Sequence, residues 1–138
     1  MTMTESAQHI KLVEIIAARA QKMVPEHYWP LIAIDTPTSN NLPQSTSEGF
    51  KPDLLYNFER MLIIGEAKTS QDIERPHSKS QYLSYIKECD AFAGQAFLII
   101  AVPWTERITV ANLIKRMFRQ EESTNCHLIV LDDIGGFK

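Results

Sequence analysis

Apolar residues recur at helical spacing in the first part of the chain and in strand-like runs after it. A helix is predicted from about Ser6 to Met23, and Pro25 ends it. The run at 28–36 predicts a strand, and the Ser-, Thr-, Asn- and Pro-rich stretch at 37–49 predicts a polar, mobile loop. The expected apolar stripe of the helix consists of Ile10, Val13, Ala17, Ala20 and Val24.

Two strand-like runs follow at 52–58 and 61–68, separated only by the polar Glu59-Arg60 step. Such spacing predicts a β-hairpin. If the turn is centred on that step, opposite residues have numbers that sum to about 119. The hairpin therefore predicts that Asp53 lies directly opposite Glu66.

The second half of the chain predicts two helices and two strands. A helix opens at Pro76 and stops before Gly94, and a second helix covers about 106–121. The run at 95–104 is continuously apolar and predicts a strand buried on both faces, and 127–132 predicts the last strand. The expected core face of the first of these helices consists of Tyr82, Ile86, Cys89 and Ala93.

The predicted element order is α-β-β-β-α-β-α-β, so we expect one mixed α/β domain over residues 1–138. Apolar residues make up 44% of the chain and charged residues 22%, which is typical of soluble globular domains. The longest apolar runs are too short to span a membrane and no signal-peptide core is present, so a cytoplasmic location is expected. Cys89 and Cys126 lack zinc-ligand or disulfide-framework spacing and are expected to be reduced.

Asp53, Glu66 and Lys68 are the residues with the strongest chemical signal. Like charges on directly opposite strand positions repel, and a divalent cation would offset that repulsion. Carboxylate oxygens suit Mg²⁺ or Mn²⁺, which retain waters and accept phosphate oxygens as further ligands. Lys68 shares a strand face with Glu66, so its ammonium group would lie beside a bound phosphate and an attacking water.

Pro52-Asp53 followed by Glu66-Ala67-Lys68 resembles the motif of the PD-(D/E)XK nuclease superfamily. That resemblance covers roughly residues 6–104 and implies a restriction-endonuclease-like αβββαβ core, to which the last helix and strand are added. It also implies Mg²⁺-dependent hydrolysis of phosphodiester bonds. In this interpretation Asp53 and Glu66 bind the metal, the Ala67 carbonyl is a further ligand, and Lys68 is catalytic.

Two helices carry further candidates by the same resemblance. Many superfamily members place a metal-binding glutamate on the first helix, and Glu14 is the preferred candidate here. Gln81 and Tyr85 resemble the QxxxY motif of RecB-like nucleases and are expected near the active site or DNA. RecB-like members usually also have an upstream metal-binding histidine, for which only His9 and His27 are available.

Several candidates have an equally ordinary structural interpretation. Gln81 and Tyr85 also fit a polar shoulder and a packed aromatic residue, and Glu14 also fits a solvated helix position. Thr69 is either a substrate contact or simply the strand end. Lys51 and Lys79 are candidates for contacts to the nucleic-acid backbone, as is Arg75.

We therefore expect a Mg²⁺-dependent nuclease, with Mn²⁺ as a substitute, that acts on DNA; RNA remains open. The net charge of −3 argues against binding by overall positive charge alone. The small size suggests a homodimer or a larger complex. The alternatives are a non-catalytic binding module of the same fold and a subunit active only with a partner, and endonuclease against exonuclease action stays open.

Overall fold

The structure is a computed structural model that describes the backbone of residues 3–134 and the side chains of residues 7–134. Its elements follow the predicted order, with two short 3-10 helices, η1 and η2, in addition. They are α1 (Met3–Met23), η1 (Glu26–Leu31), β1 (Ala33–Ile34), β2 (Leu54–Phe58), β3 (Met61–Ala67), α2 (Pro76–Ala91), β4 (Gln95–Val102), η2 (Trp104–Glu106), α3 (Arg107–Glu121) and β5 (Cys126–Asp132).

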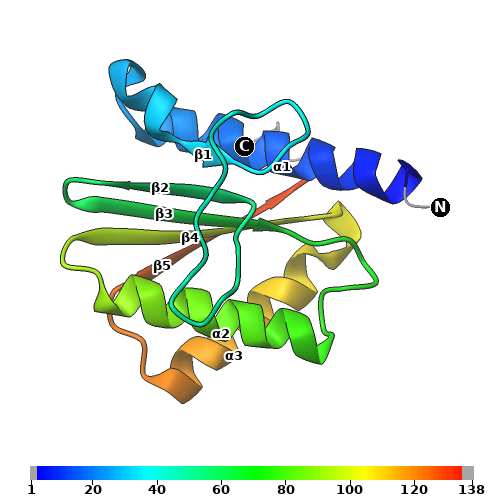
Figure 1. Cartoon of the computed structure of the whole chain (residues 1–138). Helices are drawn as coiled ribbons and strands as arrows, with labels where there is room; N and C mark the ends of the chain where they lie inside the picture. The colour runs from blue at the N-terminus through cyan, green and yellow to red at the C-terminus, as the bar shows by residue number, and fades with distance from the viewer. Residues whose placement is uncertain (1–2, 135–138) are drawn as a thin grey trace.

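The five strands form one mixed sheet in the order β1-β2-β3-β4-β5. The pairs β1·β2 and β2·β3 are antiparallel, whereas β3·β4 and β4·β5 are parallel. Figure 1 shows α1 on one side of this sheet and α2 with α3 on the other. The prediction of an α/β fold with a mixed sheet between helices is confirmed at this level.

The β2–β3 hairpin has the register that the sequence predicts. Asn57 pairs with Leu62, and Leu55 pairs with Ile64. Glu59 takes a positive φ of 54°, which allows the chain to reverse over two residues. The ladder ends at the Leu54–Gly65 pair, and the backbone N–H of Asp53 donates to the Gly65 carbonyl at 3.0 Å, which keeps Asp53 beside the end of β3 without a regular pair to Glu66.

The α1 face of the sheet is closely packed and apolar. The buried stripe of α1 consists of Leu12, Val13, Ile16, Ala20 and Val24. Ile10 and Ala17 are only partly buried, so the predicted phase of the stripe is partly wrong. The contact is close enough that a Cβ at Gly65 would lie 2.6 Å from Cγ2 of Ile16.

The α2 face has the predicted core residues except one. Tyr82, Ile86 and Cys89 are fully buried, whereas Ala93 is exposed. The helix ends at Ala91, and Phe92 has an extended backbone (ψ 135°) that turns the chain away. The prediction for Ala93 is therefore wrong because the helix stops before it.

The predicted strand at 28–36 is mostly wrong. Residues 26–31 form the 3-10 helix η1, and only Ala33–Ile34 pair with β2. The Trp29 indole N–H lies 3.0 Å from the Gln21 carbonyl and 2.9 Å from the Val24 carbonyl, so it caps the open end of α1. This tertiary contact outweighs the strand propensity of the run.

The 37–49 stretch is irregular, as predicted, but part of it is anchored to α2. Thr46 Oγ1 lies 2.9 Å from Ser84 Oγ. The N–H and the hydroxyl of Ser47 each donate to Glu88 Oε2 at 3.0 Å. These contacts hold the loop against the helix.

Candidate active site

The candidate residues of the sequence motif meet where β2 begins and β3 ends. Asp53 immediately precedes β2, Glu66 lies near the end of β3 and Lys68 follows it. Their exposed fractions are only 6%, 4% and 8%. Charged groups removed from water to this extent require partners, so the identity of those partners defines the site.

Asp53 is held through one carboxylate oxygen. Its Oδ2 accepts a hydrogen bond from the Ala67 N–H at 2.8 Å and lies 3.1 Å from His9 Nε2. The hydrogen bond to Asp53 raises the pKa of His9 above its usual value, against the opposing effect of burial. The contact with Asp53 therefore stabilises the protonated form of His9 more than water does.

Glu66 is the most electrostatically perturbed carboxyl group of the site. Tyr85 donates its hydroxyl to Oε1 at 2.8 Å, and Lys68 Nζ lies 3.5 Å from Oε2. Burial and the nearby charge of Asp53 nevertheless raise the pKa of Glu66 well above its usual value. The two carboxyl groups therefore repel each other, as expected for opposed acids.

Lys68 is fixed between the sheet and α2. Its Nζ donates to Gln81 Oε1 and forms the ion pair with Glu66. Its backbone N–H donates to the Ala101 carbonyl at 3.0 Å, which anchors the chain just beyond β3. The ammonium group thus has a defined position next to both acids.

Gln81 and Tyr85 therefore lie at the site, where each holds one of its charged residues. They were expected near the active site or DNA, and their contacts are with Lys68 and Glu66. Burial and the charge of Glu66 raise the pKa of the Tyr85 phenol, so it remains a hydrogen-bond donor. The i,i+4 spacing on α2 is what brings both side chains to the same place.

The first helix contributes His9, and the structure does not bring Glu14 to the carboxylates. Glu14 is exposed, and within residues 7–134 its side chain forms no hydrogen bond or ion pair. Residues five positions apart on an α-helix point about 140° apart, so the two side chains cannot share one face. The sequence interpretation named His9 only as one of two available histidines and preferred Glu14, because its apolar stripe was placed one phase off.

Thr69 lines a cleft beside this site, whereas Lys51 and Lys79 lie outside the network. Thr69 Oγ1 donates to Asp72 Oδ2 at 3.3 Å. Lys51 and Lys79 are exposed. The cleft has a volume of about 540 Å³ and is lined by His9, Ile10, Asp35, Thr36, Pro37, Ser39, Leu42, Thr69 and Asp72.

The donor set fits a hydrated divalent cation better than a metal caged by side chains. Within residues 7–134, no group of three or more His, Cys, Asp or Glu side chains is arranged to hold a metal ion. Mg²⁺ commonly binds through one or two carboxylates and keeps several waters. Asp53 and Glu66 supply two carboxylates, and burial together with the charge of Asp53 raises the pKa of Glu66 although Lys68 lies beside it.

Comparison with known proteins gives no match: no family model, no curated protein and no solved structure is similar to this chain. In the described part of the chain, no helix has the length and apolar character needed to cross a membrane. The functional interpretation therefore depends on the motif and on the geometry around it.

Proposed function

We propose that this protein is a metal-dependent nuclease of the PD-(D/E)XK type that hydrolyses phosphodiester bonds in DNA. The observation that supports this most is the buried pair of acids on adjacent strands with Lys68 beside them. Two opposed buried carboxyl groups cost stability, and a cation at the same place offsets that cost. An arrangement of this kind is expected where metal binding is part of the chemistry.

A divalent cation at this site would lower the pKa of a bound water and stabilise the charge that develops on the phosphate. The protein's own residues prepare the site for it. His9 and Ala67 hold Asp53 through Oδ2, which leaves Oδ1 available as a ligand. Tyr85 fixes Glu66 through Oε1, so Oε2 faces Lys68.

Lys68 acts on the water or the phosphate in this proposal. Gln81 and Glu66 hold its Nζ from two sides, so the ammonium group has little freedom to move away. A positively charged donor placed beside the reacting phosphate stabilises the transition state without further reorganisation. His9, which contacts Asp53, and Thr69 also line the 540 Å³ cleft, so a strand in that cleft would lie beside the site.

A second candidate is a module of the same fold that binds nucleic acid without cleaving it. The observation in its favour is that the described residues offer no ready group of three side-chain ligands. Under this alternative the charged network would be structural, and removing Lys68 would not change binding. The homodimer or larger complex expected from the small size stays a prediction under both candidates.

The test is cleavage of labelled single-stranded, duplex, flap and four-way-junction DNA, and of single-stranded RNA, with Mg²⁺, Mn²⁺ or EDTA. We expect metal-dependent cleavage, reduced at least about 100-fold in Lys68→Ala because a positioned proton-transfer group contributes about that much. Lys87→Ala is the control, since Lys87 is an exposed lysine on the same helix as Gln81. Undiminished cleavage by Lys68→Ala would contradict the assignment, and binding without cleavage by wild type would favour the second candidate.

A further inference from the structure

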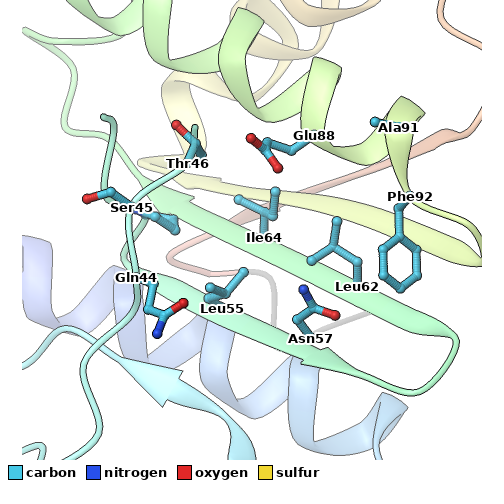
Figure 2. A pocket seen from close by; sticks show the side chains of 11 residues that line it. Gln44, Ser45, Thr46, Leu55, Asn57, Leu62, Ile64, Glu88, Ala91 and Phe92 are labelled. Atoms are coloured by element: carbon cyan, nitrogen blue, oxygen red, sulfur yellow. The ribbon is translucent and has the colours of Figure 1, made fainter. Parts of the chain in front are cut away.

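A separate pocket of about 240 Å³ lies on the α2 face of the β2–β3 hairpin, on the turn side of the candidate site. Figure 2 shows it between the C-terminal half of α2, the two strands and the loop at 44–46. The β2 and β3 side chains that line it share a sheet face with Glu66 and Lys68. Its lining includes Gln44, Leu55, Asn57, Leu62, Ile64, Glu88 and Phe92.

The floor of this pocket is apolar and is built by the hairpin. Leu62 and Ile64 are buried in the sheet, and Leu55 lies beside them. The Phe92 ring borders the pocket at the end nearer the hairpin turn (Figure 2). A floor of aliphatic side chains with an aromatic edge suits the face of one planar ring system. The volume is below that of ordinary drug-sized sites, which limits the occupant to one small ring system.

Glu88 gives the pocket a fixed hydrogen-bond acceptor. Both hydrogen bonds from Ser47 go to Oε2, which orients the carboxylate. Within residues 7–134, Oε1 accepts no hydrogen bond, and in Figure 2 the carboxylate points toward the pocket. A carboxylate held in this way selects a ligand that offers N–H groups and disfavours one that offers only a carbonyl oxygen there.

Two carboxamides lie across the pocket from Glu88. Asn57 and Gln44 project from the hairpin and the loop on the other side of the apolar floor (Figure 2). A carboxamide both donates and accepts, so it can pair with the ring-nitrogen and carbonyl pattern of a heterocycle. The pocket thus combines an apolar face with polar groups at two opposite edges.

We propose that this pocket binds a single nucleobase that carries an exocyclic amino group, with Glu88 Oε1 accepting a hydrogen bond from that amine. The choice of a nucleobase among amino-bearing heterocycles rests on the proposed nuclease function. Glutamate accepts from the cytosine N4 amine in nucleic-acid complexes, and uracil has a carbonyl oxygen at that position. Cytidine and uridine are therefore a matched pair of ligands for this acceptor.

The experiment is isothermal titration of the full chain with cytidine and with uridine in EDTA, where no cleavage occurs. We expect cytidine to bind at least about 10-fold more tightly than uridine, which corresponds to about 1.4 kcal/mol. Glu88→Gln should abolish that preference, because the amide can present an N–H group instead. Glu48→Gln changes an exposed acid in the 37–49 loop and should keep the preference for cytidine. Asn57→Ala should weaken both ligands.

Two further arms identify the source of the base. Equal affinity for cytidine 5′-monophosphate and a short oligo-dC indicates a free nucleotide, whereas much tighter binding of the oligonucleotide indicates a base from a strand. Either result supports the pocket provided that Glu88→Gln removes the preference for cytidine over uridine. Absence of saturable binding by any cytosine ligand, or equal binding of cytidine and uridine, would overturn the proposal. Since cleavage is not measured, these outcomes do not depend on whether the protein is a nuclease.

Discussion

The two faces of the central sheet are built from the same strands and differ in what they bury. On the α1 face, β3 presents Ile63, Gly65 and Ala67, and these pack in an apolar cluster with α1. On the α2 face, the same strand continues from apolar side chains to Glu66, followed by Lys68 just beyond its end. The α1 face is covered by apolar packing alone, whereas the α2 face also buries charged side chains.

This difference indicates where stability and chemistry reside. Among the described residues, no buried side-chain nitrogen or oxygen lacks a hydrogen-bond partner, so the charged network is satisfied. Satisfied buried charge is nevertheless weak evidence for stability, because desolvation offsets much of the attraction. We therefore expect substitutions on the α1 face to change folding and those in the network to change metal binding and catalysis.

His9 is the exception that joins the two faces, since it belongs to α1 and contacts Asp53. His9→Ala should lower cleavage about 100-fold, because it removes the side chain that orients Asp53, an acid of the proposed metal site. Glu14→Ala, from the exposed side of α1, should stay within about twofold of wild type. Cleavage rates at saturating Mg²⁺ measure the activity of both variants. Equal losses of activity in the two would show that His9 is not the residue through which α1 contributes.

Gly65→Ala tests the packing of the α1 face. The added Cβ would lie 2.6 Å from Ile16 Cγ2 and 3.1 Å from Leu54 Cβ, and both neighbours belong to the packed core. Overpacking of this kind costs about 1–3 kcal/mol of unfolding free energy, measurable by urea denaturation. Ala93→Ser, which adds one atom at an exposed position, should be nearly neutral. A stable Gly65→Ala protein would show that α1 can move away from the sheet.

Glu66→Gln tests the electrostatic cost of the other face and should have the smallest effect. The folded pKa of Glu66 is raised above its ordinary value of 4.5, so the folded protein retains a proton that the unfolded chain releases. Metal-free stability should therefore fall as pH rises above about 4.5 and through the raised pKa. Without metal, Glu66→Gln should melt a few degrees higher than wild type near neutral pH, since about 1 kcal/mol shifts a melting temperature by roughly 2–8 °C.

Melting curves in EDTA between pH 4 and pH 8 check this prediction, and the two proteins should converge at the acidic end. The pKa of His9 is also raised, from 6.5, so its stabilising contact is lost as pH rises through that higher value in both proteins. A wild type that gains stability across the whole range relative to Glu66→Gln would contradict the proposed repulsion.

The strand-borne part of the site could be predicted from the sequence, because strand geometry leaves few choices. A two-residue turn fixes the hairpin register, and the register places Asp53 opposite the strand that carries Glu66. The i,i+4 spacing similarly placed Gln81 and Tyr85 together. The contacts of these two side chains with Lys68 and Glu66 depend on how α2 crosses the sheet. No local sequence pattern specifies that crossing.

Glu14 was preferred to His9 on the first helix for a reason that the sequence contains. His9, Val13, Ile16 and Ala20 recur at helical spacing, so the true stripe begins with a polar residue. A stripe begun at Ile10 has similar periodicity and excludes His9. Two apolar stripes with equal periodicity can be distinguished only by what the helix packs against. The same holds for η1, where the Trp29 contacts to α1 decided the local structure.

Titration of Mn²⁺ into the nucleic-acid-free protein, followed by calorimetry, tests the central claim most directly. The proposed site predicts one bound ion per chain, with release of a proton from the carboxyl pair because ligands must be deprotonated. Affinity should fall at least about 10-fold in Asp53→Asn and stay unchanged in Glu48→Gln. Equal affinity in wild type and Asp53→Asn, or no bound ion in wild type, would contradict a metal centre at these acids.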